Sequence, residues 1–249
     1  KIDQAVKAGF AWKTGPFETW DMLGVKETVA KMKELKQSPA TWVEEMLSSG
    51  AESFYKYEKG NKLYYDINSK KYKEIPGSQG LVILDALKTN NIVWKNSGTT
   101  LYDVGDEILN LEFHTKMNTM GAEVIEGINK AISVAEKNYK GLVIGNEGDN
   151  FSAGANLGML FMLAGNREFD EISLSVQAFQ NTMMRARYSS IPVVVATSGL
   201  TLGGGTELSM HADQVRAHTE TYMGLVEFGV GIIPSGGGTK EMTLRTSDM

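Results

Sequence analysis

The stretch "IPVVVATSGLTLGGGTELSMHAD" (residues 191–213) sets the expected architecture. Its β-branched start predicts a buried strand, and the three consecutive glycines that follow predict a tight turn. The next residues have the pattern of a helix, with Glu207 in its first turn. A strand that enters a helix through such a turn exposes backbone N–H groups at the helix N-terminus, where they stabilise negative charge. The stretch therefore predicts an anion-binding turn with an acid beside it.

Two kinds of site use such a turn. A nucleotide-binding P-loop ends in Lys-Ser/Thr, which "GLTLGGGTE" (residues 199–207) lacks. A dinucleotide-binding loop needs a third glycine, but "GVGIIPSGGG" (residues 229–238) has Pro234 at that place. The other use is an oxyanion hole, in which N–H groups receive the charge that develops on a carbonyl oxygen.

A second small-residue turn and a second acid fit the oxyanion interpretation. "FSAGAN" (residues 151–156) follows the short predicted strand "GLVIG" and can supply another N–H donor from Ala153. Glu227 lies among apolar residues, and such burial favours a protonated carboxyl. Two acids beside an oxyanion hole can deliver a proton to carbon and take one from water. On spacing alone a plainer interpretation stays open, because a single such Glu is more often a salt-bridge partner and glycine-rich turns are more often only turns.

The rest of the chain predicts two kinds of region. Residues 1–58 have helical patterns, and aromatic and β-branched residues around Asn68 and Ser69 predict a hairpin. Residues 76–100 are expected to be a connector with some local structure. From Leu101 on, strands alternate with helices, including a short apolar helix capped by Asn156, and this alternation indicates an α/β architecture.

Composition narrows the classes of function. The chain has 249 residues, a net charge of −5 and 42% hydrophobic residues, which suits a globular protein and argues against a nucleic-acid partner. It has no cysteine, which excludes thiolate chemistry and suits a reducing compartment, so we expect a cytoplasmic protein. No apolar run reaches the about 18 residues of a membrane helix, so no membrane partner is expected. His211 follows Glu207 by four residues, but no third ligand is evident; we expect no metal and a solvent-facing or helix-capping histidine.

Three segments together resemble the enoyl-CoA hydratase/isomerase (crotonase) superfamily. They are "FSAGAN", "GLTLGGGTELSMHAD" and "MGLVEFGVGIIPSGGGT", and "LEFHTKMNTMGAEVIEGINKAI" (residues 111–132) is similar to the first strand, turn and helix of that family. The resemblance runs from about Leu101 to the end. It implies that Glu207 and Glu227 are the acid/base pair and that Ala153 and Gly204 donate the oxyanion N–H groups. It also implies a set of contacts with coenzyme A, namely Lys116, Met117, Asn118, Phe151, Ser152, Gly154 and Ala155.

The N-terminal part carries a second resemblance. "IDQAVKAGFAWKTGPFETWDMLGVKET" and "PATWVEEMLSSGAESFYKY" look like the C-terminal helical domain of 3-hydroxyacyl-CoA dehydrogenase. The expected domains are therefore a dehydrogenase segment at 1–58, a connector at 59–100 and a hydratase core at 101–249. The expected fold is α/β, a crotonase-like ββα spiral preceded by an all-α segment. We expect the chain to be an internal piece of a longer protein, with the NAD-binding domain upstream of Lys1.

These resemblances imply a function in fatty acid β-oxidation. The hydratase half of a bifunctional protein would add water to a trans-2-enoyl-CoA without metal or redox cofactor, and NAD would serve the dehydrogenase half. A homo-oligomer is expected. Two alternatives remain: another crotonase reaction such as double-bond isomerisation, which can use one acid, or an inactive truncated fragment or scaffold.

Overall fold

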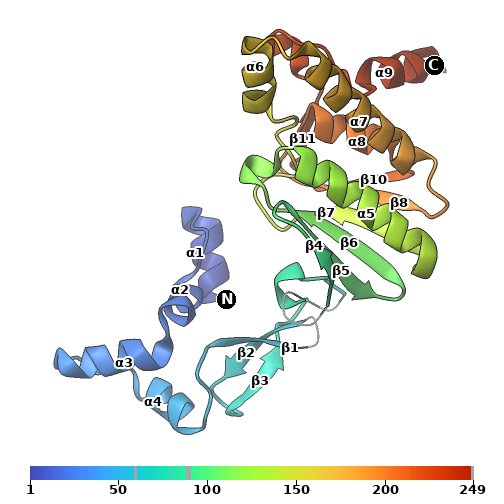
Figure 1. Cartoon of the computed structure of the whole chain (residues 1–249). Coiled ribbons are helices and arrows are strands. Elements are labelled where there is room, and N and C mark those ends of the chain that lie inside the picture. Colours follow the sequence, from blue (N-terminus) through green and yellow to red (C-terminus); the bar gives the residue numbers. More distant parts are fainter. Residues whose placement is uncertain (59–60, 79, 88–90, 248–249) are drawn as a thin grey trace. The chain divides into compact units, whose positions relative to one another are not determined.

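The protein folds as two compact units, residues 1–86 and residues 87–249, which Figure 1 colours blue to cyan and green to red. The computed structural model describes residues 1–58, 61–78, 80–87 and 91–247. Each unit buries its own hydrophobic cluster.

The first unit begins with short helices and continues into an antiparallel sheet of order β1-β2-β3. The turn between β2 and β3 holds Asn68 and Ser69, where the sequence predicts a hairpin. The boundaries that the sequence predicts at residues 58 and 100 stay predictions. The elements of this unit are α1 (Ile2–Phe10), α2 (Pro16–Leu23), α3 (Val25–Glu34), α4 (Thr41–Ser48), β1 (Tyr55–Glu58), β2 (Asn61–Asp66), β3 (Lys71–Glu74) and the 3₁₀ helix η1 (Leu84–Ala86).

Aromatic packing joins these helices to the sheet. The Phe54 ring lies 4.9 Å from the Phe17 ring, 5.2 Å from Trp20 and 5.6 Å from Trp42, in edge or tilted arrangements that aromatic pairs prefer. Asp21 of α2 accepts hydrogen bonds from the backbone N–H groups of Phe54 and Tyr55. The helices and the start of β1 therefore share one core.

The second unit is built on a mixed sheet of order β10-β8-β7-β6-β5-β4. Strands β4, β5 and β6 pair antiparallel, whereas β6, β7, β8 and β10 run parallel. A separate parallel pair joins β9 to β11. The strands are β4 (Ile92–Lys95), β5 (Thr99–Gly105), β6 (Ile108–Phe113), β7 (Gly141–Gly145), β8 (Val193–Thr197), β9 (Leu200–Leu202), β10 (Gln214–Ala217) and β11 (Tyr222–Gly224).

Helix α5 lies along one face of this sheet, with α7 packed beside it, as Figure 1 shows. On α5, Val124, Ile128 and Ile132 recur every four residues and are fully buried, because this spacing places them on one side of the helix. They share a core with Leu109 and Leu111 of β6. The helices are α5 (Ala122–Asn138), α6 (Leu157–Gly165), α7 (Phe169–Arg187), α8 (Gly204–His211), α9 (Gly238–Ser247), and the 3₁₀ helices η2 (Lys116–Asn118) and η3 (Glu227–Val230).

The predicted alternation of strands and helices after Leu101 is confirmed, and Asn156 caps α6 by accepting from the Met159 N–H. Within residues 76–100, which the sequence predicts to be a connector with some local structure, the structure has β4 and the start of β5. Asn96 makes the tight turn between them: its Oδ1 accepts from the N–H groups of Gly98 and Thr99. Asn side chains often stabilise turns in this way, by hydrogen bonds to backbone groups two and three residues further on.

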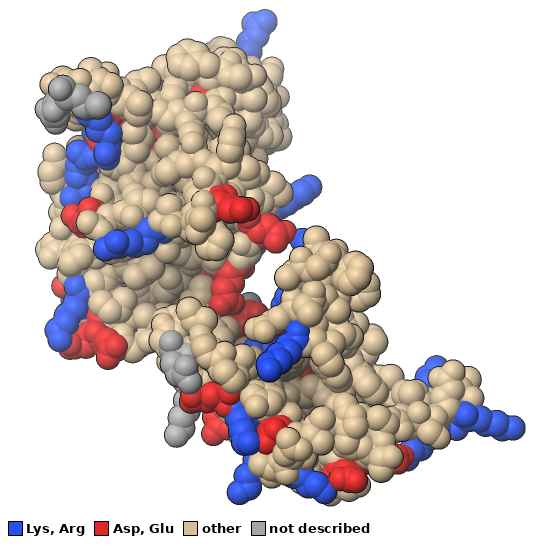
Figure 2. Space-filling view, turned by 180° about the vertical axis from the view of Figure 1, so that it is seen from behind, with Lys and Arg blue, Asp and Glu red and all other residues tan. Residues whose placement is uncertain are grey.

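The surface carries mixed charge. On the face in Figure 2, Lys and Arg stand singly or in small groups, often close to Asp and Glu. Among the described residues, no helix is both long and apolar enough to span a bilayer.

Candidate active site

The carboxyl ends of the parallel strands β6, β7 and β8 lead into the turns that build the site. Open α/β sheets bind ligands at this edge, because several loops converge there. After β8 and β9 the chain reaches Gly203, the N-cap of α8, at φ 50° and ψ −117°. An L-residue with a side chain rarely adopts that conformation. Glycine therefore lets the chain turn sharply into the helix that carries Glu207.

The second turn, 152–155, lies directly against the first. The Ser152 carbonyl oxygen accepts a hydrogen bond from the Leu202 N–H, and the Ser152 N–H donates to the Leu200 carbonyl oxygen. Gly154 has φ +92°, and a Cβ there would lie 3.0 Å from the Leu202 carbonyl oxygen and 3.5 Å from the Gly204 nitrogen. The two predicted turns thus meet backbone to backbone, which a side chain at Gly154 would prevent.

The N–H groups at this junction differ in their availability. The Ala153 N–H donates to the Met117 carbonyl oxygen at 3.1 Å, so the prediction that Ala153 is an oxyanion donor is wrong in this structure. Among the described residues, the N–H groups of Gly204 and Ala155 donate no hydrogen bond. Gly204 is the first residue of α8, where N–H groups have no partner within the helix. Gly204 and Ala155 are therefore the candidates for binding an anionic oxygen.

Glu207 is held in place by a third glycine turn. Glu207 is only 3% exposed, and its Oε1 accepts a hydrogen bond from the Gly238 N–H at 2.9 Å. Burial raises the pKa of Glu207 and the charge of Glu227 raises it further, while hydrogen bonds from Gly238 and Gly236 act in the opposite direction. A Cβ on Gly236 would lie 2.4 Å from Glu207 Oε2, so this turn can approach the carboxyl only as glycine. The sequence prediction gave this turn no role, although "SGGGT" signals one.

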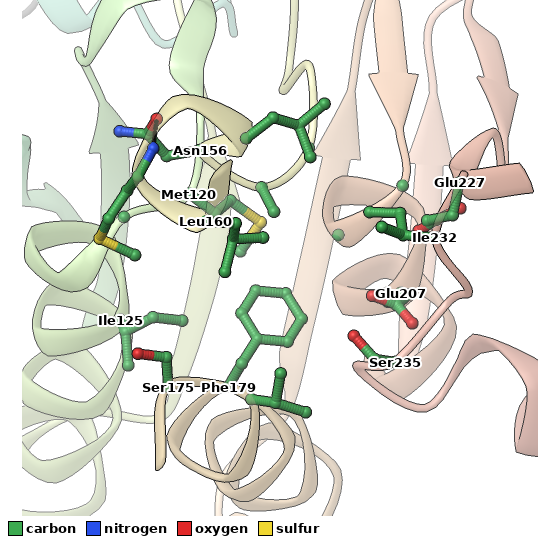
Figure 3. Close-up of a pocket in the computed structure, with 18 of the residues that line it drawn as sticks. Met120, Ile125, Asn156, Leu160, Ser175, Phe179, Glu207, Glu227, Ile232 and Ser235 are labelled. Carbon is green, nitrogen blue, oxygen red and sulfur yellow. Dashed lines mark hydrogen bonds between the residues drawn. The ribbon is translucent and has the colours of Figure 1, made fainter. Parts of the chain in front are cut away.

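Glu227 approaches from η3. It is 8% exposed, and its Oε2 is buried with no hydrogen-bond partner among the described residues. A Cβ on Gly203 would lie 3.0 Å from its Oε1. The carboxyl therefore rests against the turn that begins α8, on the same side as Glu207 (Figure 3).

Both acids line one cavity of about 430 Å³, within the range of small-ligand sites. Figure 3 places Glu207 and Glu227 on one side and Ile125 and Leu160 across the cavity. The backbones of Gly203, Gly204 and the 153–156 turn also contribute to its wall. Its apolar lining comes mainly from α5, α6, α7 and the 226–233 segment, through Ile125, Leu157, Leu160, Val176, Phe179, Val226, Val230, Ile232 and Ile233. The cavity can take an apolar chain and present its polar end to both acids.

Phe179, which the sequence prediction missed, fixes the distance between the glycine turns. A Cβ on Gly204 would lie 2.8 Å from its Cζ, and a Cβ on Gly236 would lie 2.2 Å from its Cε1. The ring thus fills the space between α7 and the two turns. No motif marks it, because it is one apolar residue among several on α7.

The residues predicted to contact coenzyme A divide into two groups. Lys116 and Met117 are exposed, and Met117 and Asn118 have φ of 56° and 51° in the turn that follows β6. Asn118 ties this turn to the next one by donating to the Asn150 carbonyl oxygen at 2.9 Å. Gly154 and Ala155 line the cavity. These positions are open to a ligand.

Phe151 and Ser152 are not open to a ligand. Both are fully buried, with the Phe151 ring 5.9 Å from the Phe113 ring in the core. The Ser152 hydroxyl donates to the Asn118 carbonyl oxygen and accepts from the Gly154 N–H. The prediction of a direct contact is therefore wrong for these two side chains, which instead hold the turn in shape.

His211 is also buried, at 2% exposure, so the prediction of a solvent-facing histidine is wrong. Its Nδ1 lies 2.7 Å from the Glu207 carbonyl oxygen. A search of the described residues finds no group of three or more His, Cys, Asp or Glu side chains placed to hold a metal ion.

Comparison with known proteins identifies the family. The model of the enoyl-CoA hydratase/isomerase family matches residues 105–246, which include every residue of the cavity described above. The chain belongs to the enoyl-CoA hydratase/isomerase family.

Relatives of this hydratase/isomerase chain extend the similarity to its N-terminal part. It is 47% identical over 245 residues to a Bacillus subtilis (strain 168) protein named "Probable 3-hydroxyacyl-CoA dehydrogenase", covering 98% of this chain and 31% of that protein. It is 32% identical over 247 residues to a Rickettsia felis protein whose name includes "fatty acid oxidation complex trifunctional enzyme", again covering 98% and 31%. The chain thus spans about a third of these relatives.

A solved enoyl-CoA hydratase from Polaromonas sp. JS666 has the same fold. It superposes with a TM-score of 0.54 at 28% identity, over 58% of this chain and 57% of that one. The predicted crotonase-like α/β core, preceded by helices, is therefore confirmed.

Proposed function

We propose that this chain carries the enoyl-CoA hydratase activity of a fatty acid β-oxidation enzyme. The observation that supports it best is one apolar cavity that holds two buried carboxyls, Glu207 and Glu227. Beside them are the N–H groups of Gly204 and Ala155, which donate to no other described residue. An apolar acyl chain with a reactive thioester at its polar end matches that arrangement.

The thioester oxygen of a trans-2-enoyl-CoA binds between the N–H groups of Gly204 and Ala155. As water attacks C3, negative charge moves to this oxygen, and the two donors stabilise it. One such donor contributes about 3–4 kcal/mol to the transition state. The α8 dipole acts in the same direction, because Gly204 is at its N-terminus.

The two carboxyls complete the addition of water. Glu207 in its ionised form takes a proton from water as the oxygen bonds to C3, and protonated Glu227 gives its proton to C2. The product is a 3-hydroxyacyl-CoA. Glu207 has gained one proton and Glu227 has lost one. Interacting carboxyls titrate as a pair, and the raised pKa of Glu207 helps it receive the proton.

The coenzyme A part of the substrate extends along the turns at 116–118 and 153–155. Lys116 places a cation at this edge of the site, where the phosphates of coenzyme A supply negative charge. Met117 and Asn118 shape the entry, and Gly154 and Ala155 line it.

We extend the proposal to the complete protein that contains residues 1–249. The product, a 3-hydroxy thioester, is the substrate class named for the Bacillus subtilis relative. NAD would serve as the hydride acceptor of a dehydrogenase activity there, and no residue of this chain is assigned to it. Hydration itself needs no cofactor or metal, and the site of action would be the cytoplasm, in a homo-oligomer.

Double-bond isomerisation is the second candidate. It can proceed with one acid, and Glu227 is the acid whose Oε2 lacks a hydrogen bond, whereas Glu207 is bound by Gly238. An assay of crotonyl-CoA hydration beside 3-enoyl-CoA isomerisation, with the complete protein, separates the two. Hydration faster by at least tenfold supports our proposal, whereas isomerisation alone would replace it and no turnover of either would refute both.

A further inference from the structure

Behind Glu207, on the side of α8 that faces α7 and α9, lies a partly buried charged cluster that the proposed reaction does not use. His211 of α8 and Glu241 of α9 are each 2% exposed. Arg187 of α7 and Lys240 of α9 complete it. Burying charge in this way is costly, so such a cluster calls for an explanation.

The hydrogen bonds fix the form of the histidine. Its Nδ1 lies 2.7 Å from the Glu207 carbonyl oxygen, which can only accept, so Nδ1 donates. Its Nε2 is left facing α9, 3.4 Å from Lys240 Nζ and 3.5 Å from Glu241 Oε1. Burial lowers the pKa of His211, although the bond to Glu207 and the charge of Glu241 oppose this. The lowered pKa favours the neutral ring, in which Nε2 accepts from Lys240.

Glu241 joins three helices. Its Oε2 pairs with Arg187 of α7, and its Oε1 faces Lys240 at 3.1 Å and the His211 ring. Its own backbone N–H donates to the Gly237 carbonyl oxygen. The carboxylate therefore fixes the first turn of α9 against α7 and lies beside the His211 ring of α8.

That turn is the one that holds the carboxyl of Glu207. The Gly238 N–H donates to Glu207 Oε1 at 2.9 Å. Next to it, Gly237 lies against the imidazole, since a Cβ there would be 2.8 Å from His211 Cε1. The turn is thus packed between His211 on one side and the Glu207 carboxyl on the other.

We propose that His211 and Glu241 act together as positioning residues for Glu207, by fixing the α9 turn whose N–H groups hold that carboxyl. The inference rests on the proposed function and deepens it. Neither side chain lines the cavity, so neither touches the substrate. Their effect reaches the reaction only through the Gly238 contact.

Two conservative substitutions test this arrangement. Glu241→Gln keeps the volume and removes the charge, and His211→Asn keeps a donor for the Glu207 carbonyl and removes Nε2. Each should lower kcat about ten- to a hundredfold through a misplaced acid, with KM changed by less than about threefold. The double variant should be no slower than the slower single variant, because both act through one contact.

The pH profile gives a readout that simple loss of stability does not move. The Gly238 N–H stabilises the ionised carboxyl, so loosening the turn should raise the pKa of Glu207 and move the acid limb of the kcat profile to higher pH. The charged groups that face this contact are Glu227 from η3, and, around the histidine, Glu241, Lys240 and Arg187. Each variant changes at most one of these groups, so the remaining charges are the same as in the wild type.

The experiment combines kinetics of the complete protein with crystal structures of wild type and Glu241→Gln. His218→Asn, at an exposed histidine, and Glu220→Gln, at an exposed acid, are matched controls that should behave as wild type. We expect loss of the Gly238–Glu207 contact in the variant together with the fall in kcat. Either change without the other, or multiplicative effects in the double variant, would overturn the inference. If wild type proves to have no hydratase activity, the proposed function fails, and the crystallographic contact alone decides whether the pair positions Glu207.

Discussion

Each of the two units buries a carboxyl against a glycine, and the two carboxyls differ in how completely they are hydrogen-bonded. In the first unit, Asp3 accepts from the Phe17 N–H at 2.9 Å, the Glu18 N–H at 3.2 Å and the Tyr55 hydroxyl at 2.8 Å. Gly15 lies against it, where a Cβ would be 2.2 Å from Asp3 Cβ. In the second unit, Glu227 lies against Gly203 and faces a cavity, but its Oε2 has no hydrogen-bond partner in the described part of the chain.

The difference separates a structural acid from a reactive one. A buried carboxylate whose oxygens are all satisfied stabilises the chain that surrounds it. A buried carboxyl with an unsatisfied oxygen costs stability, and it persists where a ligand or a reaction supplies the missing partner. Substitutions at the two sites should therefore act on different measured quantities, stability at one and rate at the other.

The largest effect should come from Glu227→Gln. The amide cannot deliver the proton to C2, so kcat for crotonyl-CoA hydration should fall about 10²–10⁴-fold, the range for a lost general acid. The midpoint of thermal unfolding should not fall, because no hydrogen bond to Oε2 is lost. A variant that keeps the wild-type rate would remove Glu227 from the reaction.

A smaller loss of rate is expected from Gly203→Ala. The added Cβ meets Glu227 at 3.0 Å, and φ 50° is strained for alanine, which together should lower kcat/KM about 10- to 100-fold. Gly229→Ala is the matched control, because a Cβ there has nothing within 4 Å. Equal rates for the two variants would mean that the Gly203 turn does not place the acid.

Asp3→Asn should act on stability alone. The amide nitrogen meets an N–H or hydroxyl donor, so the free energy of unfolding of the first unit should fall by about 1–3 kcal/mol in urea denaturation. Glu52→Gln, at an exposed acid, should stay within about 0.5 kcal/mol of wild type. An Asp3→Asn variant that is as stable as wild type but hydrates more slowly would contradict the assignment of Asp3 as a structural acid.

The smallest effect concerns pH. Because the pKa of Glu207 is raised in the folded chain, its contribution to stability is complete below the unfolded value of 4.5 and is lost as pH rises through the folded value. Glu207→Gln removes this pH-dependent loss, although its amide nitrogen meets the N–H donor that the second carboxylate oxygen now accepts from. We therefore expect the unfolding midpoint of the variant to fall less than that of wild type between pH 4 and pH 7, whatever its absolute value. An equal fall in both proteins would show that the ionisation of Glu207 does not affect stability.

Glu18 should show the opposite dependence. Hydrogen bonds from Lys62, Gly15 and Lys7 outweigh its burial and lower the pKa of Glu18 to about 2. Its contribution is therefore present above pH 4.5 and lost as pH falls toward 2, a slope that Glu18→Gln should flatten in acid unfolding curves. An unchanged slope of stability against pH would show that the ion pairs of Glu18 do not contribute to acid unfolding.

Sequence alone predicted what depends on local pattern. The β-branched run and the glycine turn gave β8, the turn and α8 with Glu207 in its first turn, because period and turn chemistry are local. The resemblance to a family then related Glu207 to Glu227, and the structure places both at one cavity.

What the sequence could not predict depends on contacts between distant segments. Ala153 and Ala155 are equally small, and only the Met117 carbonyl oxygen, 36 positions before Ala153, decides which N–H is left unpaired. Phe151 adjoins the site in sequence, yet its ring packs in the core. The bond from Gly238 to Glu207 joins α9 to α8, and the contact between Lys240 and His211 Nε2 does the same. No spacing within one segment encodes these choices.

The most direct test of the central claim is a crystal structure of the complete protein with acetoacetyl-CoA, an unreactive thioester. We predict that the thioester oxygen lies about 2.7–3.1 Å from the nitrogens of Gly204 and Ala155, with C2 and C3 between the carboxyls of Glu207 and Glu227. A cavity left empty by the thioester, or a thioester in it whose oxygen contacts neither N–H group, would contradict the account.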